Sequence, residues 1–206
     1  MNRAPFEAIL FDFDGVLVDS EPLHYECWCE IITPHGLQLS WENYEANCIG
    51  VSDRAMIETL CRVTGRPEAF DAIWAEYPAK KALFRRRAVE SVPMPQATRD
   101  VLVALESYRL AVVSSSGRAE IEPVLESAGV RQHFETIVTG DDVKRLKPSP
   151  EPYHTAAQRL GISRALVVED SPAGIASGRA AGFEVLEIAR AEEMAGLLRA
   201  RLSRPV

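Results

Sequence analysis

The 206-residue sequence has few of the features that mark specialised protein classes. Its four cysteines, Cys27, Cys29, Cys48 and Cys61, form no CxxC pair and have no histidines at zinc-binding spacing. This excludes a disulfide-stapled scaffold and a structural zinc site. We expect reduced thiols and a cytoplasmic protein.

The chain also lacks a surplus of positive charge and a long apolar run. Its formal net charge is −7, and its one basic block is Arg85-Arg86-Arg87, so a nucleic-acid partner is not expected. The apolar stretch Ala8–Phe11 is too short for a signal peptide or a membrane span, so no membrane partner is expected either. The length suits one domain of about 100–200 residues with a smaller subdomain, and we expect a monomer.

What the sequence does have is an alternation of strand and helix patterns. The apolar run at 8–11 predicts a buried strand, and from about Pro95 onward short strands alternate with helices. This alternation predicts a parallel sheet covered by helices on both faces. The expected strands are 109–113, 134–139, 165–168 and 184–188, and the expected helices are 96–107, 118–128, 150–160 and 172–181.

Residues 20–91 interrupt this alternation with helical patterns alone. Four helices are expected, at 20–33, from Ser40, from Ser52, and at 68–88 with a bend at Pro78. Asp19 and Ser20 are interpreted as the cap of the first of them. The fold class is therefore α/β, with a Rossmann-like doubly wound core (1–18 and 92–206) and an inserted all-helical, four-helix subdomain (19–91).

Polar side chains stand where four segments of the core reach one edge of the predicted sheet. In open α/β sheets, the carboxyl ends of the strands form the ligand site. Carboxylates with a nearby carbonyl suit a hard cation such as Mg²⁺. Each group alone has an ordinary structural explanation, but together they form a catalytic constellation. The residues are Asp12 and Asp14, Ser114, Lys147, and Glu169 with Asp170.

The motifs DFDGVLVDSE, VVSSS, RLKPSPEPY and VVEDSPAGI resemble those of the haloacid dehalogenase-like superfamily. The match is closest to the subgroup with a helical cap after the first motif, which includes β-phosphoglucomutase and many sugar phosphatases. The resemblance covers essentially the whole chain. It implies a Rossmann-like core and a mobile four-helix cap.

The resemblance also implies a role for each residue of the constellation. Asp12 would be the nucleophile that accepts the phosphoryl group, and Asp14 would be the general acid and base. Lys147 would neutralise the phosphate and the nucleophile, and Ser114 would donate a hydrogen bond to the phosphate. Mg²⁺ would be bound by Asp12, Asp170 and the backbone carbonyl of Asp14. Glu169 would bind the metal directly or through water.

Substrate selection is expected in the helical cap. His24 is the best candidate, because the stretch EPLHYECW resembles the one whose histidine faces the active site in related enzymes. Lys80 or Lys81 could reach the leaving group, and the alternative is a solvated lysine. In the mutase, an arginine that binds a second phosphate follows the turn equivalent to 50–52, where this chain has Asp53 and, one residue later, Arg54.

Four other polar residues lie near the same sheet edge. Ser115 and Ser116 are expected to start the following helix rather than to touch substrate. Asp141 and Asp142 are expected to shape the loop before Lys147.

The leading hypothesis is a Mg²⁺-dependent phosphatase of a small phosphorylated metabolite, most simply a sugar phosphate, that forms an aspartyl-phosphate on Asp12. A β-phosphoglucomutase-type phosphohexomutase is the alternative within the same fold. A phosphorylation-controlled receiver-like switch is the remote alternative from another class. The receiver hypothesis is disfavoured because such a fold would not carry a 70-residue insert after its first strand.

Overall fold

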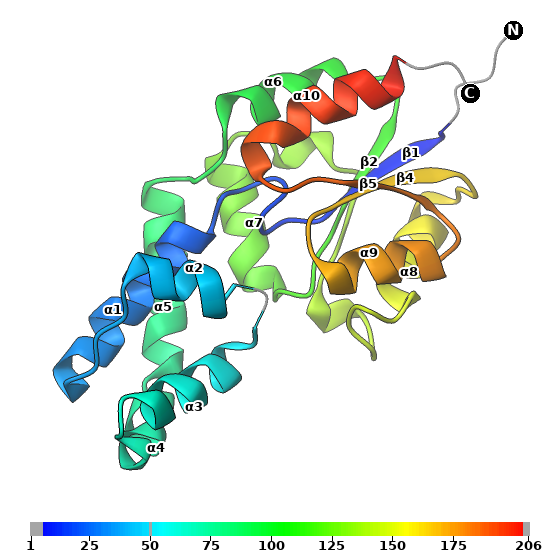
Figure 1. The fold of residues 1–206 in the computed structure, drawn as a ribbon. Helices are drawn as coiled ribbons and strands as arrows, with labels where there is room; N and C mark the ends of the chain where they lie inside the picture. The colour runs from blue at the N-terminus through cyan, green and yellow to red at the C-terminus, as the bar shows by residue number, and fades with distance from the viewer. Residues whose placement is uncertain (1–5, 50, 204–206) are drawn as a thin grey trace, which may run out of the picture. The chain divides into compact units, whose positions relative to one another are not determined.

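The computed structural model describes residues 6–49 and 51–203, which form two compact units. One unit contains the described residues up to Asp19 together with those from Val92 onward, and the other contains Ser20–Ser91 (Figure 1). Among the described residues, no helix is both long and apolar enough to span a bilayer.

The first unit is built on a five-stranded sheet in which every pairing is parallel. The strand order is β3-β2-β1-β4-β5, so the first strand lies at the centre. This confirms the predicted α/β class with a doubly wound parallel sheet. The strands are β1 (Ala8–Phe11), β2 (Arg109–Val113), β3 (Thr136–Val138), β4 (Ala165–Glu169) and β5 (Glu184–Glu187).

The strand register aligns the carboxyl ends of the three central strands. Phe11 of β1 lies opposite Val112 of β2 and Val168 of β4. The residues that follow these three positions, among them Asp12 and Glu169, therefore emerge at one level of the sheet edge. This edge could be predicted from local sequence alone, because the polar residues directly follow the apolar residues of each strand.

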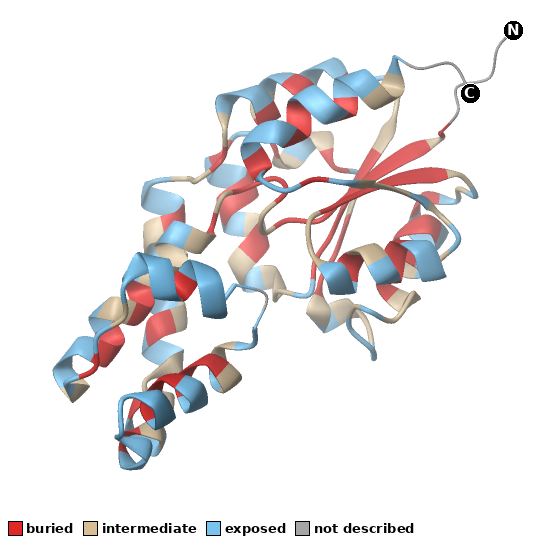
Figure 2. Ribbon diagram, viewed as in Figure 1, coloured by how far each residue is buried: buried red, intermediate tan, exposed pale blue. Residues whose placement is uncertain are grey.

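Helices cover both faces of the sheet, as Figure 1 shows with α8 and α9 on one side and α6 and α10 on the other. On the α8 side, Tyr153 and Leu160 pack with strand residues such as Leu10 and Val167 in one buried cluster. Figure 2 shows β1, β2 and β4 buried along most of their length. The helices are α6 (Gln96–Ala104), α7 (Arg118–Ser127), α8 (Glu151–Leu160), α9 (Pro172–Ala180) and α10 (Ala191–Leu202).

Two details of this unit differ from the sequence-based expectation. The strand expected at 134–139 is shorter, because a 3₁₀ turn at Arg131–His133 precedes it and β3 begins only at Thr136. The C-terminal helix α10 was not predicted. It buries Met194, Ala195 and Leu198, a spacing that would have indicated a helix.

The second unit is helical and has its own apolar core around Trp28, Ile57 and Ile73. The fourth expected helix is two helices, since the chain breaks at Glu76 (φ −88°, ψ 0°), two residues before Pro78. The described part of this unit therefore holds five α-helices rather than the expected four. They are α1 (Glu21–Ile32), α2 (Trp41–Asn47), α3 (Asp53–Val63), α4 (Phe70–Ala75) and α5 (Tyr77–Glu90).

Two of the three serines expected to begin helices cap them with their side chains. Ser40 Oγ accepts a hydrogen bond from the backbone N–H of Asn43, and Ser52 Oγ accepts one from Ala55. Ser20 stands at the N-cap position of α1 but makes no such bond, because its backbone is already helical (φ −86°, ψ −15°). Asp19 does not cap α1 either, since it precedes the N-cap, and its N–H donates to the Pro93 carbonyl at 2.7 Å.

Candidate active site

Three carboxylates meet at the carboxyl edge of the central strands. Asp12 follows β1, Glu169 is the last residue of β4, and Asp170 comes next. One oxygen from each lies within 4.8 Å of the others. Asp12 and Glu169 are buried, at 8% and 0% exposure. Three acids this close together, two of them buried, need compensating positive charge.

Lys147 supplies part of that charge from the loop before α8. Its Nζ donates to Asp12 Oδ1 and to Glu169 Oε1, each at 2.6 Å, and to the Val113 carbonyl at 2.8 Å. The side chain is 5% exposed. The ammonium group is thus fixed between two carboxylates and the last carbonyl of β2. It lies beside Asp12, the residue whose charge it was expected to neutralise.

The pKa values of the site residues reflect the excess of carboxylates over cations around Lys147. Burial, with the neighbouring Glu169 and Asp170 carboxylates, raises the pKa of Asp12 well above its usual range, although Lys147 opposes the shift. Burial and Glu169 raise the pKa of Asp170 to about 7. Burial alone would lower the pKa of Lys147, but Asp12 and Glu169 reverse that effect and raise it. A further cation at this point would lower the cost of ionising both aspartates.

The geometry around Asp170 fits a hard divalent cation. Asp170 Oδ1 is buried and has no hydrogen-bond partner among the residues the structure describes. A Cβ at Gly15 would lie 2.1 Å from Asp170 Oδ2, and Gly15 has φ +76°, so only glycine allows the turn after Asp14 to approach so closely. Carboxylate oxygens from Asp12 and Asp170 beside this turn are the donor set that Mg²⁺ prefers.

Asp14 lies in the turn after Asp12, and Ser116 contacts it. Ser116 Oγ donates to Asp14 Oδ2 at 3.0 Å, and the Ser116 backbone N–H donates to Ser114 Oγ at 3.0 Å. Ser114 is 3% exposed at the end of β2. The expectation that Ser115 and Ser116 start the next helix is wrong, because α7 begins at Arg118 with Gly117 as its N-cap.

Asp142 shapes the loop after β3, as expected. Its Oδ2 accepts hydrogen bonds from the backbone N–H and the hydroxyl of Thr139, at 2.8 and 2.7 Å, and pairs with Arg118 at 2.8 Å. Its Oδ1 accepts from Arg159 at 2.7 Å. Asp141 Oδ2 accepts from the Arg118 backbone N–H at 2.9 Å. Both carboxylates therefore serve the loop that leads to Lys147.

The helical unit contains the remaining predicted residues, and two of them lie together. Lys80 Nζ is 2.7 Å from His24 Nδ1 and 3.5 Å from Asp53 Oδ2. Lys80 is 1% exposed, so the alternative of a solvated lysine is wrong for this residue. Its ammonium lies 5.1 Å from the centre of the Trp28 ring, whose Nε1 donates to Asp53 Oδ1 at 2.7 Å.

Arg54 is engaged elsewhere in the same unit. Its Nε pairs with Glu58 Oε1 at 3.1 Å, one turn along α3. Its guanidinium lies over the rings of Phe70 and Trp74, at 4.9 and 5.5 Å from their centres. Arg54 therefore contributes to packing between α3 and the following helix, and it does not join the His24–Lys80 pair.

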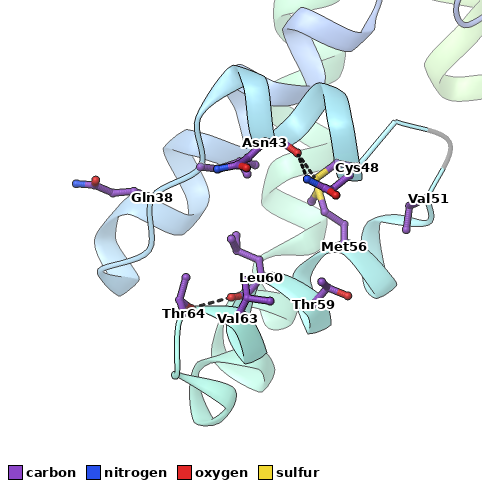
Figure 3. Close-up of a pocket in the computed structure, with 11 residues that line it drawn as sticks. Gln38, Asn43, Cys48, Val51, Met56, Thr59, Leu60, Val63 and Thr64 are labelled. Atoms are coloured by element: carbon purple, nitrogen blue, oxygen red, sulfur yellow. Dashed lines mark hydrogen bonds between the residues drawn. The ribbon is translucent and has the colours of Figure 1, made fainter.

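The helical unit also has a pocket of about 380 Å³ between α2 and α3 (Figure 3). Met56 and Leu60 of α3 face Asn43 and Cys48 across it, as the figure shows. The Thr64 hydroxyl donates a hydrogen bond to the Leu60 carbonyl. Its lining side chains are amides, hydroxyls, aliphatic groups, one thioether and one thiol. Because the lining carries no charged group, this pocket does not have the chemistry of a phosphate site.

Comparison with known proteins identifies the family. The family model described as haloacid dehalogenase-like hydrolase matches residues 9–188. The chain belongs to the haloacid dehalogenase-like hydrolase family. This confirms the resemblance that the four motifs indicated.

Three individual proteins illustrate the similarity. Validoxylamine A 7'-phosphate phosphatase of Streptomyces hygroscopicus subsp. limoneus is 32% identical over 182 residues, which cover 86% of this chain and 83% of the relative. Fructose-1-phosphate phosphatase of Escherichia coli (strain K12) is 29% identical over 187 residues, covering 89% and 96%. The crystal structure of CbbY from Rhodobacter sphaeroides in complex with phosphate has a TM-score of 0.69 and 26% identity, covering 88% and 85%.

Among the unpredicted residues of this haloacid dehalogenase-like hydrolase that contact predicted site residues are Ser116 and Tyr153. Ser116 contacts Asp14, and the Tyr153 hydroxyl donates to Glu169 Oε1 at 2.8 Å. Both stand inside the quoted motifs, Ser116 in VVSSS and Tyr153 at the end of RLKPSPEPY. Position within a motif was therefore the available signal, whereas their contacts depend on the tertiary fold.

Proposed function

We propose that this chain is a Mg²⁺-dependent phosphatase that hydrolyses a small sugar phosphate through an aspartyl-phosphate on Asp12. The observation that carries the proposal is the contact of Lys147 with Asp12, beside an Asp170 whose Oδ1 is buried. A nucleophilic carboxylate, a fixed cation and a metal-binding carboxylate are what phosphoryl transfer needs at one point. Relatives named as phosphatases of phosphorylated carbohydrates support this substrate class.

In the first step, an oxygen of Asp12 attacks phosphorus and the bond to the substrate's ester oxygen breaks. Lys147 stays beside the attacking carboxylate, and its charge offsets that of the incoming phosphate. Ser114 donates a hydrogen bond to a phosphate oxygen. Asp12 and Asp170, with the backbone carbonyl of Asp14, would hold Mg²⁺, which supplies the charge that keeps both carboxylates ionised and neutralises the phosphate.

Asp14 handles the proton in both steps. It gives a proton to the departing alcohol and then takes one from the water that hydrolyses the acyl phosphate. The hydrogen bond from Ser116 supports this role because it fixes the orientation of the Asp14 carboxyl group. A single carboxyl group can serve both steps, since the first leaves it in the ionised state that the second requires.

The helical unit, 19–91 by the sequence-based boundaries, is proposed as the cap that selects the substrate. His24 and Lys80 are its proposed substrate-binding residues, and their mutual contact at 2.7 Å would make them act together. Arg54 is the weaker candidate because Glu58 and two aromatic rings already engage it.

The negative charge of Asp53 argues against the mutase alternative. A mutase must bind two phosphate groups in turn, and a bidentate arginine is suited to that task. Here Asp53 places a carboxylate beside Lys80 and is held by Trp28. A negative charge at that place opposes a second phosphate, so we favour hydrolysis.

The experiment is a screen of phosphorylated metabolites with Mg²⁺, in which inorganic phosphate and glucose 6-phosphate are measured separately. We expect phosphate release from at least one sugar monophosphate. With β-glucose 1-phosphate, glucose 6-phosphate as the main product would instead support the mutase. Asp12→Asn should abolish turnover, and Asp14→Asn should lower it by roughly 10²–10⁴-fold.

The matched control is Asp100→Asn, which changes an exposed aspartate on α6 that accepts a hydrogen bond from Gln96. It should retain the wild-type rate. Substrate labelled at phosphorus should transfer the label to Asp12 during turnover. Label found on another residue, or full activity of Asp12→Asn, would refute the proposal.

A further inference from the structure

Both carboxylate oxygens of Glu169 accept hydrogen bonds, whereas Asp170 Oδ1 has no donor among the described residues. Its Oε1 accepts hydrogen bonds from Lys147 Nζ at 2.6 Å and from the Tyr153 hydroxyl at 2.8 Å. Its Oε2 accepts from the backbone N–H groups of Asp170 and Ser171, at 3.1 and 3.2 Å, and from the Ser171 hydroxyl at 3.1 Å. A carboxylate offers about four lone-pair directions, so five donors occupy them all. Glu169 is built to hold donors in place.

The carboxylate is also held sterically. Its exposure is 0%, and a Cβ at Gly174 would lie 1.7 Å from Oε1. The start of α9 therefore lies directly against Glu169, and the side chain is closed off from bulk solvent. Its five donors set its orientation.

Tyr153 is a neutral side chain that touches both members of the Glu169–Lys147 ion pair. Its hydroxyl donates to the carboxylate, and its ring centre lies 5.2 Å from Lys147 Nζ. Its exposure is 0%, and it packs in the cluster that joins α8 to the sheet. Water cannot replace the hydroxyl at such a place, so its removal leaves Oε1 with Lys147 as its single donor.

We infer that Tyr153 is a positioning residue for Lys147, acting through the hydrogen bond that fixes Glu169. Lys147 Nζ is shared between Glu169 Oε1 and Asp12 Oδ1 at equal distances of 2.6 Å. The hydrogen bond from the Tyr153 hydroxyl partly neutralises the negative charge on Oε1 and so weakens the attraction of Glu169 for the ammonium group. Without the hydroxyl, Lys147 shifts toward Glu169 and away from Asp12, where the phosphate must bind.

This inference rests on the proposed function, and a double-mutant cycle separates the two. The variants are Tyr153→Phe, Lys147→Ala and the combination of both. For each, kcat and KM are measured with the best substrate of the screen, and calorimetry gives the affinity for inorganic phosphate in Mg²⁺. We expect Tyr153→Phe to lower kcat by about tenfold and to weaken phosphate binding, as for residues within one network.

In the Lys147→Ala background, Tyr153→Phe should change neither quantity, because the residue through which it acts is gone. Phosphate affinity gives this answer even where the double variant turns over too slowly to measure. Equal losses from Tyr153→Phe in both backgrounds would assign it a structural role and overturn the inference. So would a Tyr153→Phe enzyme with wild-type kcat and phosphate affinity.

Tyr44→Phe is the matched control for the loss of a buried tyrosine–glutamate bond. Tyr44 is 4% exposed, and its hydroxyl donates to Glu21 Oε2 at 2.7 Å within the helical unit. It should lower the melting temperature but keep kcat within about twofold, since it acts on no charge of the site.

Glu169→Gln is the second variant, in case Tyr153→Phe does not fold. It keeps the size of the side chain but removes its charge, and its effect on phosphate affinity should likewise vanish in the Lys147→Ala background. An undiminished effect there contradicts the inference. If Lys147→Ala itself leaves both turnover and phosphate binding unchanged, the proposed function fails, whatever Tyr153 does.

Discussion

Asp170 combines a raised pKa with a buried oxygen, Oδ1, that has no donor among the described residues, and these properties conflict in the metal-free protein. An exposed aspartate ionises near pH 4, but burial and Glu169 move the pKa of Asp170 to about 7. The folded state thus binds a proton that the unfolded state has released between these two values. Its stability therefore falls as the pH rises from about 4 to about 7, and the cost is complete above that range.

Asp170→Asn should remove this cost when no divalent metal is present. In EDTA at pH 8, we expect the variant to be more stable than the wild type by about 1–4 kcal/mol, and at pH 4.5 to be nearly equal to it. Denaturant titrations at several pH values measure the difference.

Adding Mg²⁺ should reverse the order at pH 8, because only the wild type has the carboxylate that binds it. If Asp170→Asn destabilises the metal-free protein at pH 8, the conflict inferred from burial does not exist.

At the scale of an element, the loop after β3 depends on one carboxylate that joins three parts of the core. Asp142 bonds Thr139 at the end of β3, Arg118 at the start of α7 and Arg159 in α8. Burial works against its ionisation, but the bonds from Arg159 and Thr139 hold its pKa below the usual range. The stabilisation is therefore present above about pH 4 and is lost as the pH falls further.

Asp142→Asn should destabilise the protein by about 1.5–3 kcal/mol at pH 7, the usual contribution of a hydrogen bond to a charged group. The difference from the wild type should shrink below pH 4. The control is Glu135→Gln, which breaks an exposed pair with Arg109 and should cost at most about 1 kcal/mol. Thermal denaturation at pH 3.5 and 7 tests both, and equal losses in the two variants would contradict the bridging role.

The elements show how far local sequence information reaches. Apolar runs placed β1, β2 and β4 well because each stops at polar residues, and glycines after α7, α8 and α9 mark the ends of those helices. The break at Glu76 and the late start of β3 were less predictable. They depend on how neighbouring turns pack, which propensity does not determine.

The same division holds within the candidate site. Asp12, Lys147, Glu169 and Asp170 could be predicted to meet, because a parallel sheet brings strand ends together. That Glu169 would be occupied by five donors could not be predicted, since Tyr153 and Lys147 reach it from the loop and helix after β3. The burial of Lys80 could not be predicted from the sequence either, because lysine side chains are seldom buried.

At the scale of the whole molecule, the two units have separate apolar cores. Ile57 is fully buried in the core of the helical unit, and Leu166 is fully buried in β4. Truncating either to alanine should cost about 2–5 kcal/mol of local stability. The two losses should appear in different parts of the chain.

Hydrogen exchange read by mass spectrometry provides the test. Ile57→Ala should accelerate exchange within 20–91 and leave β1, β2 and β4 protected, whereas Leu166→Ala should do the reverse. If Ile57→Ala lowers protection of the sheet to the same extent as that of its own helices, the two units unfold as one cooperative body.

The central position of β1 also has a consequence for biosynthesis. Its neighbours lie at Arg109–Val112 and Ala165–Val168, so the first strand to leave the ribosome waits for partners that are translated about 100 and 157 residues later. The helical segment at 20–91 is translated before either partner, so its last helix, α5, can pack on α1 while β1 is still unpaired. Nascent chains should therefore acquire a folded helical segment while the hydrophobic β1 still depends on chaperones.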